Sequence, residues 1–143
     1  MAYSNYDAST TNKSKRSNKI YSDLNLSFTK NPATKDVAKI FDVQAIKRAV
    51  KNIILTNKYE RPFNSDFGCN LRGFLFENIT DPLLVIIKDR VAMAIEKYEP
   101  RVSVEDVVVQ NDEENNGLNI MVSFLINGTE APVSVSTFLQ RVR

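Results

Sequence analysis

The sequence predicts an α+β fold in which two main helices pack on a small, mostly antiparallel C-terminal β-sheet, with an extended N-terminal arm. Two observations favour this class. Apolar residues recur at helical spacing in residues 43–55 and 82–98. The C-terminal third is instead rich in β-branched residues, with strict apolar–polar alternation in one segment and Asn-Gly turn signals between segments.

The composition divides the chain into a tail, an arm and one domain. Residues 1–18 are rich in Ser, Thr, Asn and Lys, so we expect a disordered basic tail. Residues 19–39 are expected to form an extended arm, and residues 40–143 a single α+β domain. Residues 1–39 hold seven Lys and Arg against three Asp and Glu, whereas residues 40–143 hold twelve against fourteen. The basic N-terminal part could meet nucleic acid or an acidic protein surface, or be a solvated leader.

The residue types that are missing exclude several kinds of chemistry. The chain has no histidine, which removes the commonest general base and metal ligand and excludes a Ser–His–Asp arrangement. Cys69 is the single cysteine, so no disulfide can form within the chain. There is no glycine-rich nucleotide motif, no apolar run long enough to span a membrane, and no apolar core typical of a secretory signal peptide. We therefore expect no cofactor, no metal site and no membrane partner.

The first helix is expected over residues 43–55, with Asp42 as its N-cap. Its cations Lys47, Arg48 and Lys51 fall on the polar face, where they could bind an acidic partner or simply be solvated. The apolar stripe consists of Val43, Ile46, Val50, Ile53 and Ile54.

A loop is expected after this helix, because residues 57–72 contain many turn formers. Phe63, Phe67 and Leu71 recur every four residues, which predicts that they pin the loop to the core. Residues 73–78 could form a helical turn.

The second helix has clear boundaries in the sequence. Asp81 is a candidate N-cap, and Pro82 suits the first helical position because its missing N–H leaves no unpaired donor there. Pro100 disfavours the α conformation at Glu99, so the helix must end near Tyr98. The apolar stripe consists of Leu84, Ile87, Val91, Ala94, Ile95 and Tyr98.

Three strands are expected in the C-terminal third. Residues 102–109 are rich in valine, and the polar run after them ends in Asn116-Gly117, a hairpin turn signal. Residues 118–126 alternate strictly between apolar and other positions. Residues 133–142 could make a third strand after Asn127-Gly128. Its outward positions include Ser134, Ser136 and Gln140.

Two segments are candidate interaction sites. Pro100 ends the second helix, and Arg101 then presents a planar fork suited to a partner carboxylate. In the alternative interpretation, Arg101 caps the helix carbonyls and Glu99 pairs locally. The other candidate is the last strand, since an open sheet edge could take a strand from a neighbour or be covered by the N-terminal arm. Its candidate residues are Val133, Val135, Thr137 and Leu139.

A glycoside hydrolase is the alternative function, because two carboxylates at a suitable separation can cleave a glycosidic bond. Seventeen acidic residues in 143 make chance pairs certain, so we expect no catalytic residues. The candidate acids are Glu77, Glu96, Glu99 and Glu105.

Several strings, taken in order, resemble one known family. They are Arg61-Pro62-Phe63, Asp66-Phe67-Gly68-Cys69-Asn70-Leu71, Leu75-Phe76-Glu77-Asn78 and Tyr98-Glu99-Pro100-Arg101. Their order and spacing resemble the baseplate wedge or sheath-initiator family of contractile-tailed phages, a lysozyme-like wedge protein family shared with type VI secretion baseplates. Lys19-Ile20-Tyr21-Ser22-Asp23 also resembles the start of the phage members. The resemblance covers roughly residues 19–142.

The resemblance implies a structural virion protein of the tail baseplate, present in the host cytoplasm during assembly. It implies that Glu99, Pro100 and Arg101 contact other wedge proteins, and that the last strand engages the tail sheath protein and templates its polymerisation. Tail tube or hub-proximal proteins are further possible partners, and no nucleic acid is expected. Some members carry a lysozyme label, so a lysozyme-like enzyme acting on peptidoglycan stays the alternative. Residues 1–18 match no part of the family, and we expect them to become ordered only in the assembled baseplate.

Overall fold

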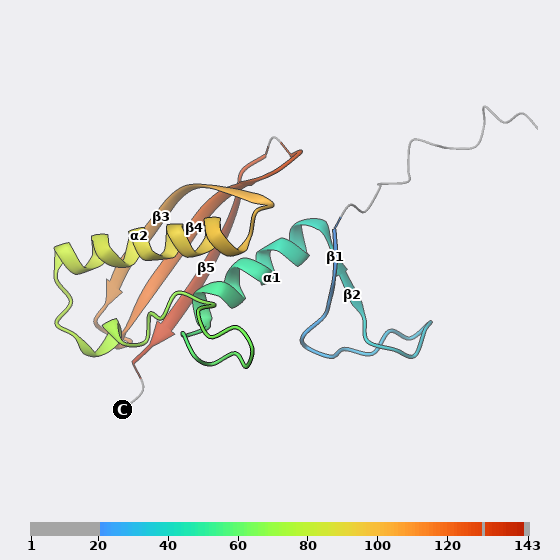
Figure 1. Cartoon of the computed structure of the whole chain (residues 1–143), viewed down its shortest axis with the longest axis horizontal. Helices are drawn as coiled ribbons and strands as arrows, with labels where there is room; N and C mark the ends of the chain where they lie inside the picture. Colours follow the sequence, from blue (N-terminus) through green and yellow to red (C-terminus); the bar gives the residue numbers. More distant parts are fainter. Residues whose placement is uncertain (1–20, 130, 142–143) are drawn as a thin grey trace, which may run out of the picture. The chain divides into compact units, whose positions relative to one another are not determined.

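The computed structural model of this chain describes residues 21–129 and 131–141. The chain forms two compact units, residues 1–42 and residues 43–143. The expected α+β class is confirmed, because two α-helices accompany a three-stranded antiparallel sheet (Figure 1). The disorder expected for residues 1–18 lies outside the described residues.

The described part of the first unit is a small antiparallel ribbon. Strand β1 (Ser22–Leu24) pairs with β2 (Lys39–Phe41), and an isolated bridge joins Lys30 to Val37. The Tyr21 N–H donates to the carboxylate of Asp42 over 3.0 Å. The segment expected to be an extended arm therefore folds back, and its strand β1 pairs with residues 39–41. Three of its large apolar side chains are more than half exposed: Leu24, Leu26 and Phe28.

Helix α1 (Asp42–Leu55) follows this ribbon and carries one apolar stripe, as expected. Asp42 is its first residue. Two residues differ from the predicted stripe. Val43 is only half-buried, and Ala45, which the prediction omitted, is buried. The fully buried residues are Ala45, Ile46, Val50, Ile53 and Ile54.

Helix α2 (Asp81–Tyr98) ends where Pro100 predicted. Its N-cap is Thr80 rather than Asp81, because the backbone is extended at Thr80 and already helical at Asp81. Leu84 and Tyr98 are half-buried, and Leu83 lies in the core. The buried residues are Leu83, Ile87, Val91, Ala94 and Ile95.

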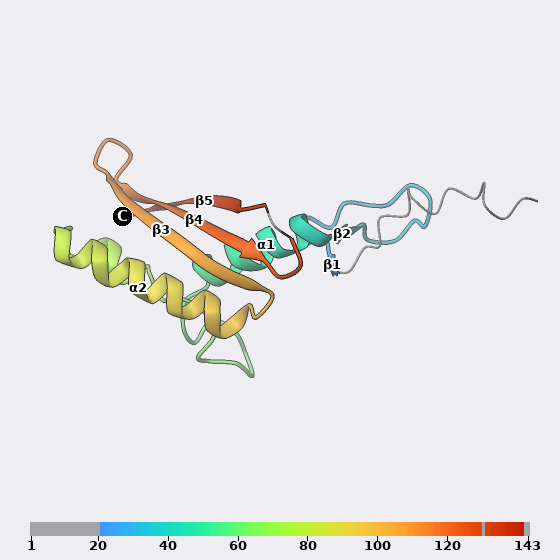
Figure 2. The ribbon, with the colours of Figure 1, turned by 90° about the horizontal axis from the view of Figure 1, so that it is seen from above.

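The three-stranded sheet has the order β3-β4-β5, with β3 (Val102–Asp112), β4 (Gly117–Ile126) and β5 (Val133–Gln140). Figures 1 and 2 show α1 and α2 on the same face of this sheet. The predicted alternation of β4 is confirmed, because every second side chain is buried beneath the helices. These side chains are Leu118, Ile120, Val122, Phe124 and Ile126.

The loop between the helices only partly follows the prediction. Leu71 is buried, Phe67 is half-buried, and residues Phe74–Phe76 form the expected helical turn as a 3-10 helix. Phe63 is fully exposed, so the prediction that it packs in the core is wrong. The physical reason is its left-handed backbone, with φ of 68°, which breaks the every-fourth-residue spacing.

Candidate functional site

The segment that follows α2 is organised by an ion pair within the chain. Arg101 donates from Nε to Oε1 of Glu99 over 2.5 Å and from a terminal nitrogen to Oε2 over 2.6 Å. The Glu99 side chain is only 5% exposed, whereas that of Arg101 is 30% exposed. Local pairing of Glu99, one of the two interpretations of the sequence, is what the structure shows. The carboxylate fixes the plane of the guanidinium, a geometry that bidentate pairs enforce.

The backbone of this segment is also tied down from the sheet. The Asn127 side-chain amide donates to the carbonyl of Pro100 over 3.0 Å, and the Asn127 N–H donates to the carbonyl of Arg101 over 2.9 Å. The Glu99 N–H closes the last turn of α2 on the carbonyl of Ile95. Pro100 itself is exposed. Pro100 and Arg101 are therefore held in a fixed conformation and are partly exposed.

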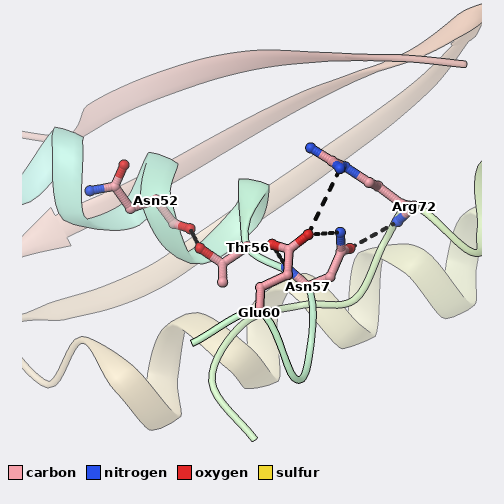
Figure 3. Close-up of polar contacts among 5 residues, drawn as sticks. All are labelled: Asn52, Thr56, Asn57, Glu60 and Arg72. Atoms are coloured by element: carbon pink, nitrogen blue, oxygen red, sulfur yellow. Dashed lines mark hydrogen bonds and ion pairs between the residues drawn. The ribbon is translucent and has the colours of Figure 1, made fainter. Parts of the chain in front are cut away.

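The neighbouring loop, residues 57–72, is closed at its neck by a polar network (Figure 3). The Asn57 backbone N–H and side-chain amide each donate to the Glu60 carboxylate over 2.9 Å. The Asn57 side-chain oxygen accepts a 3.4 Å hydrogen bond from the backbone N–H of Arg72, whose guanidinium lies 3.8 Å from Glu60. This network joins the two ends of the loop.

The Glu60 carboxylate also makes the neck sensitive to acid. Hydrogen bonds from Asn57, with help from the Arg72 charge, hold the pKa of Glu60 below its ordinary value of 4.5. A carboxylate with a lowered pKa contributes stability above the unfolded-state pKa. That contribution is lost as the pH falls through the folded-state pKa.

The far side of the loop is fastened to α2 through Tyr98. The Tyr98 hydroxyl donates to the carbonyl of Asp66 over 2.6 Å, and its ring lies 4.9 Å from that of Phe67. The Arg61 guanidinium covers the Phe67 ring at 3.9 Å. The loop therefore has a defined position beside the last turn of α2.

Strand β5 is the second predicted site, and its side chains divide by alternation. Val133 is half-buried, whereas Ser134, Ser136, Phe138 and Gln140 point outward and are exposed. The other predicted edge residues, Val135, Thr137 and Leu139, are buried in the core.

The open edge of β5 follows from its hydrogen-bond register. The Arg141 N–H donates to the Asn116 carbonyl over 2.8 Å, and antiparallel pairs alternate between bonded and non-bonded. Odd-numbered residues of β5 therefore bond to β4, and the N–H and C=O groups of the even-numbered residues face the other side. In the described part of the chain, β5 has a neighbouring strand on one side only. A partner strand would thus bond to the even-numbered residues Ser134, Ser136, Phe138 and Gln140, each one position away from a residue that the sequence suggested.

The described residues offer little material for catalysis or metal binding. They contain no cluster of three or more Cys, Asp or Glu that could hold a metal ion. Burial raises the pKa of the Cys69 thiol to about 12, so at neutral pH it is protonated and a poor nucleophile. No described helix is long and apolar enough to cross a membrane.

One polar pocket, of 220 Å³, does gather carboxylates from Glu77, Asp112 and Glu113. The side-chain amide and backbone N–H of Asn115 hold the pKa of Asp112 below its ordinary value of 3.8. A general acid for glycoside cleavage needs a raised pKa, so this environment shifts Asp112 in the wrong direction.

Comparison with known proteins decides the family. The sequence pattern of the family described as baseplate wedge protein gp25 matches residues 42–131. The chain belongs to this baseplate wedge family. The matched region runs from the start of α1 beyond the end of β4, so it includes loop 57–72 and the Glu99–Arg101 segment. The resemblance inferred from the sequence strings is thereby confirmed.

Baseplate wedge protein gp25 of Enterobacteria phage T4 is 38% identical to this wedge-family chain over 85 residues. The alignment covers 59% of the chain and 64% of the T4 protein, so it spans less than two thirds of that relative.

Three solved structures share the fold. A Geobacter sulfurreducens protein named for a tail lysozyme has a TM-score of 0.64 and 24% identity, covering 70% of this chain and 91% of that one. A chain of the anti-feeding prophage baseplate has a TM-score of 0.60 and 24% identity, covering 86% and 87%. A chain of the post-contraction pyocin R2 baseplate has a TM-score of 0.60 and 16% identity, covering 76% and 100%. At such identities these likenesses establish the fold alone.

Proposed function

We propose that this chain is a structural wedge component of a contractile phage tail baseplate, carried in the virion and made in the host cytoplasm during assembly. The observation that carries this proposal is the family match over residues 42–131. The 38% identity to the T4 wedge protein supports it, as does the shared fold of chains in two other baseplates.

The contact with other wedge proteins is assigned to the Glu99–Arg101 segment. The ion pair fixes the Arg101 guanidinium before any partner arrives, and Pro100 is exposed beside it. A preorganised contact loses less side-chain entropy on binding than a mobile one. The rigid segment therefore supports a role as a docking point, and tail tube or hub-proximal proteins are further candidate partners.

The contact with the tail sheath protein is assigned to the open edge of β5. A sheath strand would extend the sheet by pairing with the outward backbone groups of Ser134, Ser136 and Phe138, and so begin the polymer. Strand addition gains its affinity from main-chain hydrogen bonds. Exposed edges are usually protected in proteins that do not use them, which supports this use of β5.

The strand-addition proposal is tested by proline substitution at two adjacent positions. Ser136→Pro removes an N–H that faces the open edge, so the fold should survive and sheath recruitment should fall by about tenfold or more. The measurement is sheath polymerisation on baseplates assembled with the variant, together with the melting temperature of the isolated protein.

Two controls sharpen this test. Ser136→Ala keeps the N–H and should recruit sheath normally, whereas Val135→Pro removes an N–H bonded to β4 and should destabilise the sheet itself. Normal sheath polymerisation on Ser136→Pro baseplates would show that β5 does not accept a strand.

We also propose that the chain is not an enzyme. The Glu99 carboxylate is held on both oxygens by Arg101, and the Asp112 pKa is shifted away from that of a general acid. Purified protein should release no soluble fragments from peptidoglycan above a buffer blank. Turnover that disappears in a Glu77→Gln variant would establish the glycoside hydrolase alternative, which the tail lysozyme name of one fold relative suggests.

A further inference from the structure

A groove of 390 Å³ lies between loop 57–72 and the C-terminal half of α2. Its cations are Lys58, Arg90 and Lys97, and the single carboxylate among its lining residues is Asp66. The groove therefore carries a positive charge, although residues 40–143 hold twelve Lys and Arg against fourteen Asp and Glu. This local excess is not a consequence of the overall composition.

The two cations that α2 contributes to the groove lie on one side of the exposed Met93. Arg90 and Lys97 line the groove on one side of Met93, whereas helical periodicity places Asp89 and Glu96 on its other side. The Arg90 guanidinium lies 5.0 Å from the centre of the Phe74 ring, and the Lys97 ammonium lies 5.0 Å from that of Tyr98. These ring contacts position both cations beside the groove.

The floor of the groove is apolar and partly uncovered. Met93 is 63% exposed, and it lines the groove together with Ala94, Tyr98 and the buried Cys69. Methionine packs readily against varied surfaces, which suits a contact that must accept an incoming side chain. The groove thus combines an apolar floor with three positively charged side chains.

We propose that this groove binds an acidic segment of a partner protein, which inserts an apolar side chain over Met93 and places carboxylates near Lys58, Arg90 and Lys97. Charge complementarity selects this occupant. The chain's own N-terminal tail is a poor occupant, since Lys13, Lys15, Arg16 and Lys19 would face like charges. Nucleic acid fits less well, because the floor of the groove is apolar and suits an apolar side chain better than a phosphate backbone.

The proposal is tested with the full chain and a dye-labelled synthetic peptide in which glutamates flank two adjacent leucines, with binding followed by fluorescence anisotropy. We expect the peptide to bind, and its affinity to fall as salt rises because exposed charges are screened. Lys97→Glu should weaken binding by about tenfold. Met93→Ser should also weaken it without unfolding the domain, because the side chain is largely exposed.

The matched controls separate this site from general charge attraction. Lys51→Glu makes the same charge change at an exposed lysine of α1 that does not line the groove, and its affinity should stay within about twofold of wild type. A second peptide, with every glutamate replaced by glutamine, should bind at least about tenfold more weakly.

Several outcomes would overturn the proposal. These are equal binding of both peptides, equal weakening by Lys51→Glu and Lys97→Glu, or no binding of the acidic peptide at millimolar concentration. Tighter binding of a single-stranded DNA probe would assign the groove to nucleic acid. Self-association that Lys97→Glu abolishes would assign it to a second copy of the chain. Binding in the groove does not depend on the proposed contacts of Glu99–Arg101 or β5. A negative result for the groove would therefore leave those contacts untouched, and the reverse also holds.

Discussion

Replacing Arg101 with alanine is expected to lower the free energy of unfolding by about 2–4 kcal/mol, because the substitution leaves the Glu99 carboxylate buried without its partner. Of the two interpretations of the sequence, the one in which Arg101 binds a partner carboxylate would place the loss in partner binding and leave the fold largely intact. The bidentate pair, with Glu99 only 5% exposed, changes that expectation. Urea unfolding of the purified variant measures the loss.

A second substitution identifies the cause of that loss. In Glu99→Gln/Arg101→Ala the buried charge is gone, so part of the lost stability should return. Arg101→Lys keeps the positive charge but cannot form two parallel hydrogen bonds, so its free energy of unfolding should lie between those of wild type and Arg101→Ala. The single variant Glu99→Gln completes the comparison. If the double variant loses as much free energy of unfolding as Glu99→Gln and Arg101→Ala lose together, the two side chains are not coupled.

Replacing Gly68 with alanine is expected to cost about 3 kcal/mol, which is large for the addition of one methyl group. Gly68 has a φ of 104°, and a Cβ at this position would lie 2.2 Å from the backbone carbonyl oxygen of Thr56. The clash is with backbone rather than a flexible side chain, so the loop would have to move away from the end of α1. The measurement is the shift in melting temperature.

Gly73→Ala is the matched control, since it adds the same methyl group in the same connection between the helices. Apart from Gly73 itself and its two chain neighbours, no heavy atom lies within 4 Å of a Cβ at this position, so this variant should be as stable as wild type or slightly more stable. Equal losses in the two alanine variants would contradict the geometry described for Gly68.

The elements of the fold were predictable because their signals are local. Pro82 and Pro100 mark the ends of α2, and strict alternation marks β4. These signals act within one turn or one strand, so they can be read without knowledge of the fold. The one-residue error at the N-cap of α2 has the usual size for a helix boundary.

The details of the candidate sites were less predictable because they depend on contacts between distant residues or on backbone conformation. Exposure of Phe63 depends on its left-handed φ, which the four-residue spacing does not reveal. Lys58 and Lys97 are far apart in sequence and meet in one groove only because Tyr98 fastens the loop to α2.

For β5, the sequence predicted the strand but not its hydrogen-bonding register. The alternation of serines in β5 did identify the face that points away from the helices, but this alternation does not say which backbone groups lie at the open edge of the strand. The register that assigns these groups to Ser134, Ser136, Phe138 and Gln140 comes from the pairing with β4. Sequence alone could therefore name the strand but not the bonding residues.

The most direct test of the central claim is a cryo-electron microscopy reconstruction of the assembled baseplate with this chain in place. We expect a partner strand hydrogen-bonded to the open edge of β5 and a wedge-protein surface against Pro100 and Arg101. A reconstruction in which both the β5 edge and the Glu99–Arg101 segment face solvent would contradict it.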